Sequence, residues 1–286
     1  MSDFVTLHEV GPRDGLQNEP NLIATADKVR LIDLLGTSGL RHIEVGSFVS
    51  PKWVPQMADT AQVLAQIAPT AAQTAVLVPN MKGWDGFIAA RQPNTDYQVA
   101  VFISASEGFS QSNLGCSIAD SVNRLAPVVA AAQLAGVAVR GYVSCVTDCP
   151  FDGPTTPTAV ARAVGMLRNL APMPISLGDT IGQGTPHTVA AMLRAVLTDT
   201  PAQDLAGHFH DTGGRAIDNI CLSLDMGLRA FDAAVGGLGG CPYAPGAPGN
   251  VATETVLARL HADGIRTGVD ADVIAQAAEL AKGMRS

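Results

Sequence analysis

Short runs of apolar and β-branched residues recur along the chain and predict eight strands. These runs lie at residues 5–10, 42–48, 74–78, 97–104, 139–146, 174–180, 205–211 and 230–237. Between them, apolar residues recur with a helical period. In the stretch 25–35, for example, Val29, Ile32 and Leu35 share one face, as apolar residues three or four positions apart do on a helix. Strands and helices are therefore expected to alternate from one end of the chain to the other.

This alternation predicts a parallel sheet covered by helices. Eight such units in a chain of 286 residues favour an α/β fold of the closed (β/α)8 type, the TIM barrel, which needs about 250 residues. An open, doubly wound sheet of the Rossmann type is the alternative. Because no linker-like stretch divides the chain, we expect a single domain over residues 1–286, with extra C-terminal helices at 253–260 and 272–280.

Composition narrows the classes of protein to which the chain can belong. Hydrophobic residues make up 47% of the chain and charged residues 15%, so a large core is expected and disorder is not. The net charge of -8 provides no basic field for nucleic acid or an anionic membrane. The odd number of cysteines, 5, and the lack of a signal peptide or long apolar span predict a cytoplasmic protein. A small-molecule partner is expected, and a homo-oligomer stays open.

A (β/α)8 barrel builds its active site at the carboxyl ends of its strands. Chemically capable side chains stand at those ends: Arg13 and Asp14 after the first strand, Glu44 in the second, Asp179 in the sixth, His208 and His210 in the seventh, and Cys241 and Asn250 after the eighth. We therefore expect one site at this end of the barrel.

His208 and His210 are two residues apart in a predicted strand, so their side chains point the same way and can bind one ion. An isolated pair of this kind is more often structural, but its place at a strand end and the following Asp211 favour a ligand role. Asp14 and Asn250 would add a carboxylate and an amide oxygen. This set, which lacks a thiolate, suits Mg²⁺ or Mn²⁺ with open positions, although Zn²⁺ and Fe²⁺ use the same types of ligand.

The remaining candidates each have a structural alternative. Arg13 projects from a tight Gly-Pro turn and can face a developing oxyanion, or it forms an ordinary ion pair in the turn. Glu44 lies in a largely apolar strand, where a buried carboxylate needs a partner such as Arg13, unless it stands at an exposed edge or rim of the barrel. The same two interpretations apply to Asp179. The glycine- and proline-rich stretch 236–250 predicts a mobile lid that carries Cys241 as a proton donor or acceptor, or else a flexible connector.

Four segments of the chain resemble the 3-hydroxy-3-methylglutaryl-CoA lyase family. They read EVGPRDGLQNE at 9–19, SFVSPKWVPQMAD at 47–59, SLGDTIG at 176–182 and GGLGGCPY at 236–243. The resemblance extends from about Val5 to Gly268. Its cysteine loop and arginine-aspartate opening are highly specific in combination, whereas the opening alone and the His-x-His pair are shared with a broader superfamily of metal-dependent TIM barrels. It implies a metal-dependent TIM-barrel lyase that cleaves 3-hydroxy-3-methylglutaryl-CoA to acetyl-CoA and acetoacetate, a reaction of leucine degradation and ketone-body formation.

The resemblance also implies a role for each candidate residue. Arg13 would stabilise the enolate oxygen of the departing acetyl-CoA, and Glu44 would orient Arg13 and the metal site. Asp179 would lie near the substrate, and Cys241 would transfer a proton to or from the acetyl unit. The divalent cation, Mg²⁺ or Mn²⁺, would be held by Asp14, His208, His210 and Asn250.

Two departures from the family pattern bear on the substrate. Where the family usually has His-x-His-Asp-Thr-Tyr-Gly-Gln, this chain has Gly213 for the tyrosine and Arg215 for the glutamine. The loss of a ring leaves room for a related branched 3-hydroxyacyl-CoA, such as an isohexenylglutaryl-CoA. Two further alternatives are a Claisen-type synthase or aldolase on the same scaffold and a non-catalytic metal-binding barrel. The cysteine loop counts against a synthase or aldolase. A non-catalytic barrel would not need the full set of candidate catalytic and metal-binding residues found here.

Overall fold

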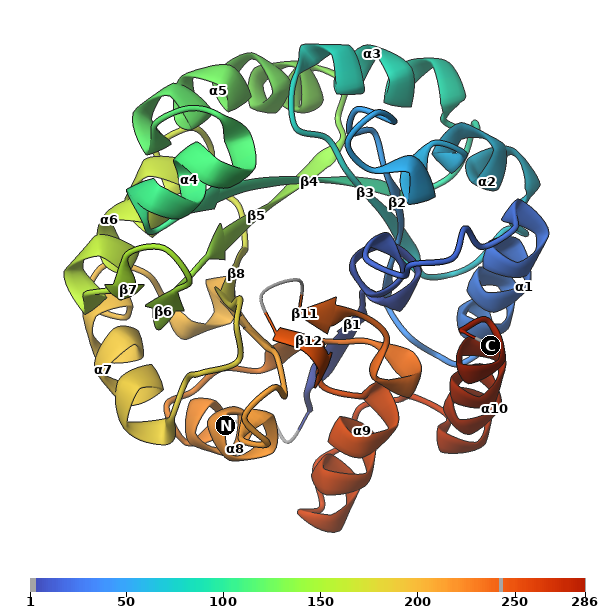
Figure 1. Ribbon diagram of the computed structural model, residues 1–286. Coiled ribbons are helices and arrows are strands. Elements are labelled where there is room, and N and C mark those ends of the chain that lie inside the picture. Colours follow the sequence, from blue (N-terminus) through green and yellow to red (C-terminus); the bar gives the residue numbers. More distant parts are fainter. Residues whose placement is uncertain (1–3, 242–243, 286) are drawn as a thin grey trace.

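The computed structural model describes residues 4–241 and 244–285, with the backbone alone at residues 240–241 and 244–248. Eight strands close into one barrel (Figure 1), and every adjacent pair is parallel. In barrel order they are β1 (Thr6–Glu9), β10 (Ala230–Ala233), β9 (Leu205–Phe209), β8 (Ile175–Asp179), β5 (Ala138–Ser144), β4 (Tyr97–Ser104), β3 (Gln73–Leu77) and β2 (His42–Ser47). The predicted (β/α)8 barrel is confirmed, and the open sheet is excluded.

Helices surround the barrel on its outer side (Figure 1). Their bounds are α1 (Thr25–Gly36), α2 (Thr60–Gln66), α3 (Met81–Ala90), α4 (Glu107–Leu114), α5 (Ile118–Leu134), α6 (Pro157–Arg168), α7 (Pro186–Val196), α8 (Ala216–Asp225), α9 (Thr253–Ala262) and α10 (Ala271–Gly283). The predicted C-terminal helices are confirmed as α9 and α10. None of the helices in the described part of the chain has the length and apolar character needed to cross a membrane.

The main apolar core lies between the strands and the helices, whereas the inside of the barrel also holds charged side chains. Leu7, Val99 and Phe231 belong to the buried apolar cluster. Arg140 of β5, in contrast, forms an ion pair with Asp232 of β10, although β8 and β9 separate these strands in the barrel. Such a contact must cross the barrel interior, so the inward-facing positions are free to carry chemistry.

Several short elements extend the barrel at the carboxyl ends of its strands. A π-helical turn, η1 (Gly11–Gly15), follows β1. Two antiparallel hairpins pair β6 (Asp148–Cys149) with β7 (Gly153–Pro154) and β11 (Gly240–Cys241) with β12 (Ala244–Pro248). Two short 3-10 turns at this end are η2 (Pro55–Met57) and η4 (Val235–Gly237), whereas a third, η3 (Ala202–Asp204), precedes β9 at the opposite end of the barrel. The predicted lid at 236–250 thus contains a short hairpin, which overlaps β1 in the view of Figure 1.

Candidate active site

The turn η1 presents Arg13 and Asp14 directly after β1. An added Cβ on Gly15 would lie 2.6 Å from the Cβ of Leu238, so glycine is what lets this turn pack against the segment after β10. Arg13 is 6% exposed. The turn therefore fixes a cation and an anion, adjacent in sequence, at the end of the barrel where the site was expected.

Glu9, at the end of β1, joins the turns that frame the site. Its Oε1 accepts hydrogen bonds from the backbone N–H of Gly11 (2.7 Å) and of Val235 (3.1 Å), and its Oε2 accepts one from Oγ1 of Thr253 (2.7 Å). Burial raises the pKa of Glu9 to about 7, although these donors act in the opposite direction. Sequence reasoning missed this residue, and the available signal was a carboxylate near the end of the first predicted strand, shortly before the Gly-Pro turn.

Arg13 is held by two carboxylates. Its Nε and Nη2 donate to Oε1 and Oε2 of Glu44 at 2.8 and 3.1 Å, and its Nη1 donates to Oδ1 of Asp14 at 2.6 Å. Burial alone would lower the pKa of Arg13, but Glu44 and Asp14 outweigh it and raise that pKa. Glu44 is 3% exposed, so the sequence prediction that it pairs with Arg13 is confirmed and an exposed rim position is excluded.

Asp14, His208 and His210 form a group that can hold a metal ion, since one ligand atom from each lies within 4.8 Å of the others. Burial opposes ionisation of Asp14, but Arg13 and the two histidines hold the pKa of that carboxyl well below its usual range. Burial lowers the pKa of His210 to about 4, so its imidazole is neutral at pH 7. Its buried Nδ1 has no hydrogen-bond partner among the described residues. An anionic oxygen beside available imidazole nitrogens fits a divalent cation.

Asn250 lies next to this group. Its Nδ2 donates to Oδ2 of Asp14 at 2.8 Å and to the carbonyl oxygen of Leu238 at 3.4 Å, and its backbone forms an antiparallel bridge with His210. The sequence predicts an oxygen ligand here, whereas the structure turns the amide nitrogen toward Asp14. Ligation through Oδ1 therefore requires the amide to turn over.

His208 is oriented by a residue that sequence reasoning missed, Asp232. Nδ1 of His208 lies 3.1 Å from Oδ2 of Asp232, and Nε2 lies 3.8 Å from Oδ2 of Asp14. Burial opposes ionisation of Asp232, but Arg140 and His208 hold the pKa of this carboxyl well below its usual range. Because an ionised carboxylate only accepts hydrogen bonds, Nδ1 of His208 carries the hydrogen. Burial lowers the pKa of His208, yet Asp232 and Asp14 raise it overall.

Tyr142 connects the two sides of the site. Its hydroxyl accepts from Nη1 of Arg140 at 2.9 Å and donates to Oε2 of Glu44 at 2.7 Å. Polar contacts therefore run without interruption through Asp14, Arg13, Glu44, Tyr142, Arg140, Asp232 and His208. Two features of the sequence could have indicated these contacts. Arg140 and Tyr142 stand at alternate positions of one predicted strand, and Asp232 stands inside an otherwise apolar predicted strand.

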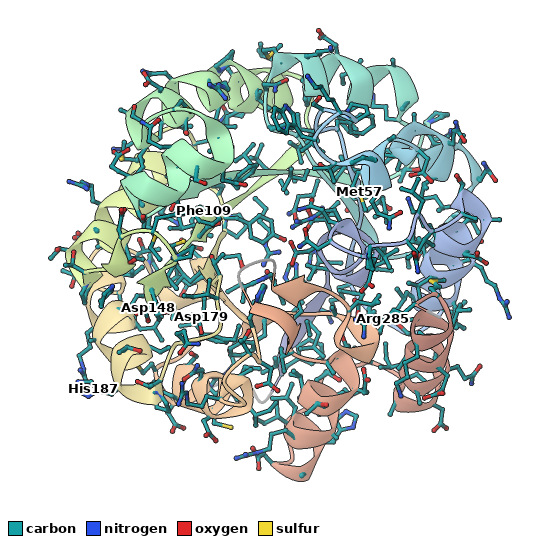
Figure 2. All side chains as sticks on the ribbon, in the orientation of Figure 1. Met57, Phe109, Asp148, Asp179, His187 and Arg285 are labelled. Atoms are coloured by element: carbon teal, nitrogen blue, oxygen red, sulfur yellow. The ribbon has the colours of Figure 1, made fainter. Side chains whose placement is uncertain are left out.

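Asp179 has its own partners in the loops after β5 and β8. It is fully buried, its Oδ1 accepts from Oγ1 of Thr147 at 2.6 Å, and its Oδ2 accepts from the backbone N–H of Gly184 at 2.9 Å. Burial raises the pKa of Asp179. Asp179 is the last residue of β8 and therefore lies at the same end of the barrel, inside the ring of helices where Figure 2 labels it. Its described hydrogen bonds, however, go to those loops rather than to the ligand group.

The side chain of Cys241 lies outside the described residues, but its hairpin is anchored beside the ligand group. Gly236, Gly237 and Gly239 have φ values of 64°, 58° and 100°, a region that favours glycine. A Cβ on Gly239 would lie 3.0 Å from Nδ2 of Asn250. The base of the hairpin therefore packs directly against a candidate metal-binding residue.

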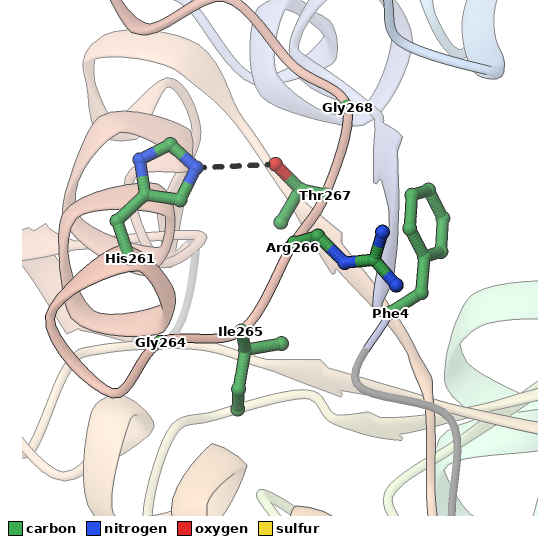
Figure 3. A pocket seen from close by; sticks show the side chains of 7 residues that line it. All are labelled: Phe4, His261, Gly264, Ile265, Arg266, Thr267 and Gly268. Atoms are coloured by element: carbon green, nitrogen blue, oxygen red, sulfur yellow. Dashed lines mark hydrogen bonds between the residues drawn. The ribbon is translucent and has the colours of Figure 1, made fainter.

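A separate hollow of about 530 Å³ lies at the other end of the barrel, because its lining comes from the segment before β1 and the connection between α9 and α10 (Figure 3). Its polar side chains are few: His261 and Thr267, which contact each other at 3.4 Å, and Arg266. It contains no carboxylate or pair of imidazoles, so the group around Asp14 is the better candidate for chemistry.

Comparisons with known proteins show which chains this one is similar to. The chain matches the HMGL-like family model over residues 5–281. A Pseudomonas aeruginosa protein named 3-hydroxy-3-isohexenylglutaryl-CoA/hydroxy-methylglutaryl-CoA lyase is 52% identical over 276 residues, covering 96% of this chain and 91% of that protein. The crystal structure of the HMG-CoA lyase from Brucella melitensis has a TM-score of 0.96 at 55% identity, with 99% of each chain covered. An HMG-CoA lyase from Acinetobacter baumannii in complex with coenzyme A and 3-methylmalate has a TM-score of 0.92 at 35% identity, covering 100% of this chain and 92% of that one.

Proposed function

Because this chain belongs to the HMGL-like family, we propose that it cleaves 3-hydroxy-3-methylglutaryl-CoA into acetyl-CoA and acetoacetate. The observation that carries the proposal is the group formed by Asp14, His208 and His210 with Arg13 in contact with it. In this group a guanidinium that can stabilise an oxyanion lies next to a candidate cation site. In addition, relatives with about 50% sequence identity are named for this activity.

The group has the ligands for a divalent cation, and we assign Mg²⁺ or Mn²⁺ to it. Asp14, His208 and His210 would hold the ion, and Asn250 would join them after its amide turns over. When bound, such an ion lowers the pKa of a coordinated hydroxyl and neutralises charge on substrate oxygens. The absence of thiolates from this set and the supply of carboxylate oxygen support a hard cation.

The reaction breaks the bond between C2 and C3 of the substrate. The C3 hydroxyl loses its proton and becomes the ketone of acetoacetate, and the electron pair of the broken bond moves to C2 and the thioester oxygen. A proton delivered to C2 then completes acetyl-CoA. One proton leaves oxygen and one reaches carbon, so the site must stabilise an enolate and supply a proton donor.

Arg13 is placed to stabilise the enolate oxygen. A guanidinium has five N–H groups, and Glu44 and Asp14 accept from three of them. Two N–H groups therefore remain for a substrate oxygen. Because Glu44 binds two nitrogens of the same guanidinium, its plane is fixed before the negative charge develops, which is the condition for effective oxyanion stabilisation.

We assign delivery of the proton to C2 to Cys241, because this residue occupies the cysteine position of the loop that resembles the family. The hairpin that carries Cys241 has its base against Asn250, and this placement of the hairpin supports the assignment. Asp179, through Thr147 and Gly184, supports the loops at the same end of the barrel and shapes the site around the acyl group.

A longer branched acyl group is a second candidate substrate. Gly213 is exposed, and a Cβ there would lie 3.0 Å from Nη2 of Arg215. Arg215 therefore occupies the space that a side chain at position 213 would enter, so the two departures from the family pattern are spatially coupled. The Pseudomonas aeruginosa relative is named for both the isohexenyl and the methyl compound.

An assay of metal-stripped protein tests the activity and the acyl group together. With Mg²⁺ or Mn²⁺ restored, we expect 3-hydroxy-3-methylglutaryl-CoA to yield acetyl-CoA and acetoacetate in equal amounts, and the isohexenyl analogue to be cleaved as well. Without metal, neither should react. Absence of cleavage with either ion would overturn the proposal. The cytoplasmic location and a homo-oligomer stay predictions.

A further inference from the structure

Arg140 and Asp232 form a buried ion pair inside the barrel next to the ligand group. We infer that this pair is a positioning unit, which keeps the hydrogen of His208 on Nδ1 and so leaves Nε2 available for the cation. The inference rests on the metal site proposed above. Neither residue belongs to the ligand group, and both are almost fully buried, at 3% and 2% exposure.

The two oxygens of Asp232 have different partners. Oδ1 pairs with Nη2 of Arg140 at 2.5 Å, whereas Oδ2 faces Nδ1 of His208 at 3.1 Å and accepts from Oγ of Ser176 at 2.7 Å. Asp232 and His208 are also register partners on the neighbouring strands β10 and β9. Because Arg140 holds one oxygen, the carboxylate plane is fixed with the other oxygen toward the imidazole.

The ion pair is also connected, through Arg140, to the residues that hold Arg13. Nη1 of Arg140 donates to Tyr142, and Tyr142 donates to Glu44, which holds Arg13. The guanidinium of Arg140 is thus fixed from both sides, and it cannot follow Asp232 into another orientation without breaking these contacts. Histidines that ligate metals are commonly oriented by a carboxylate on their other nitrogen, and the loss of that partner costs about 10- to 100-fold in metal affinity.

Asp232→Asn tests the inference through the tautomer of His208. Arg140 has only donors, so it will attract the amide oxygen of the asparagine, and the amide N–H2 will then face Nδ1. The hydrogen of His208 must move to Nε2, where it blocks the cation. We expect Mn²⁺ to bind about 10- to 100-fold more weakly, and ¹⁵N NMR of the imidazole to show the hydrogen transferred from Nδ1 to Nε2.

A double variant distinguishes positioning from general structural support. In Asp232→Asn combined with Arg140→Met, no guanidinium attracts the amide oxygen, so the oxygen can accept from both His208 and Ser176. We expect the double variant to recover Mn²⁺ affinity by at least about tenfold relative to Asp232→Asn, with the hydrogen back on Nδ1. A purely structural role predicts the opposite, because the second substitution removes further contacts.

Asp59→Asn is the matched control. It breaks the ion pair between Lys28 and Asp59, which is 2.7 Å long and joins α1 to the start of α2 rather than belonging to the contacts of His208. We expect this variant to melt at a lower temperature and to bind Mn²⁺ with unchanged affinity.

The outcomes separate this inference from the proposed function. If the wild-type protein binds no Mn²⁺, the proposed metal site is wrong. If the wild type binds Mn²⁺ and Asp232→Asn binds it equally well with the hydrogen on Nδ1, the positioning role is wrong. Should Asp232→Asn fail to fold because it leaves Arg140 unpaired, the double variant decides alone: affinity within about tenfold of the wild type supports the inference, and a larger loss overturns it.

Discussion

At the scale of single residues, Arg13 shows how a buried cation is kept charged and oriented. Two carboxylates flank it, and the bidentate contact with Glu44 fixes the plane of the guanidinium. Lysine cannot reproduce this arrangement, because its ammonium is a point charge without a fork of donors. The chemistry of the site therefore depends on the shape of this side chain as well as on its charge.

Arg13→Lys is expected to lower kcat by about 100- to 1000-fold, the cost of removing one preorganised oxyanion donor. The measurement is the steady-state rate of acetyl-CoA release, with circular dichroism to verify the fold. Arg91→Lys, at an exposed position just after α3, is the control and should retain the wild-type rate. A kcat within a few fold of wild type for Arg13→Lys would contradict the role of the guanidinium.

Cys241→Ala is expected to lower kcat by at least about 100-fold, in the range of lost general acid or base catalysis, while Mn²⁺ affinity and melting temperature stay unchanged. Cys221→Ala, on the outer helix α8, is the matched control. Rates measured with both variants test the proton-transfer role, and an unchanged rate for Cys241→Ala would remove this thiol from the mechanism.

The candidate site was only partly predictable from sequence. Arg13 and Asp14 share one turn and His208 and His210 share one strand, so local motifs reveal them. Tyr142 and Asp232 act through partners on strands across the barrel, and that pairing depends on strand register. Register is set by the closed barrel as a whole, which a local pattern does not encode.

At the scale of elements, the turn η1 depends on a close approach between two loops. The missing side chain of Gly15 lets this turn contact Leu238, where a Cβ would approach another Cβ to 2.6 Å. Neither atom is the end of a flexible chain, so an added methyl group must move the backbone that carries Arg13 and Asp14.

Gly15→Ala is therefore expected to lower the free energy of unfolding by about 1 to 3 kcal/mol, the usual cost of overpacking, and to reduce activity. Gly165→Ala in α6, where a Cβ would meet no atom within 4 Å, should instead stabilise the protein by about 0.5 to 1 kcal/mol. Urea unfolding of both variants is the measurement. Equal effects of the two substitutions would show that the packing of η1 is not critical.

Glu9, which joins the turns after β1 and β10, gives the fold a pH dependence. Its pKa is raised from 4.5 to about 7 in the folded state, so the folded protein binds the proton more tightly than the unfolded chain between these values. The free energy of unfolding should then fall as the pH rises from 4.5 to 7, by up to about 3 kcal/mol. Glu9→Gln should remove this decline, whereas Glu279→Gln, at an exposed position on α10, should not. The same decline in Glu9→Gln, measured by urea unfolding at several pH values, would contradict this origin.

Elements with a strong local pattern were predictable, and those made by distant contacts were not. Each of the eight barrel strands falls within or close to its predicted run, because apolar and β-branched residues mark it. The hairpin of β6 and β7 and the turn η1 carry no such period. Their form depends on neighbours elsewhere in the fold, as the contact between Gly15 and Leu238 illustrates.

At the scale of the whole molecule, stability and chemistry occupy different places. The apolar core lies between the barrel and its helices, and the polar contacts from Asp14 to His208 cross the barrel interior. Substitutions in the interior can therefore change the site while the apolar core stays intact. This separation is typical of barrels that host chemistry at the carboxyl ends of their strands.

The central claim is that Asp14, His208 and His210 bind one divalent cation at the end of the barrel. Anomalous diffraction at the manganese absorption edge, from crystals grown with Mn²⁺, tests it most directly. We predict one strong peak within bonding distance, about 2.0 to 2.3 Å, of the Asp14 carboxylate and of both imidazoles. A peak elsewhere, or no peak at saturating Mn²⁺, would contradict the claim.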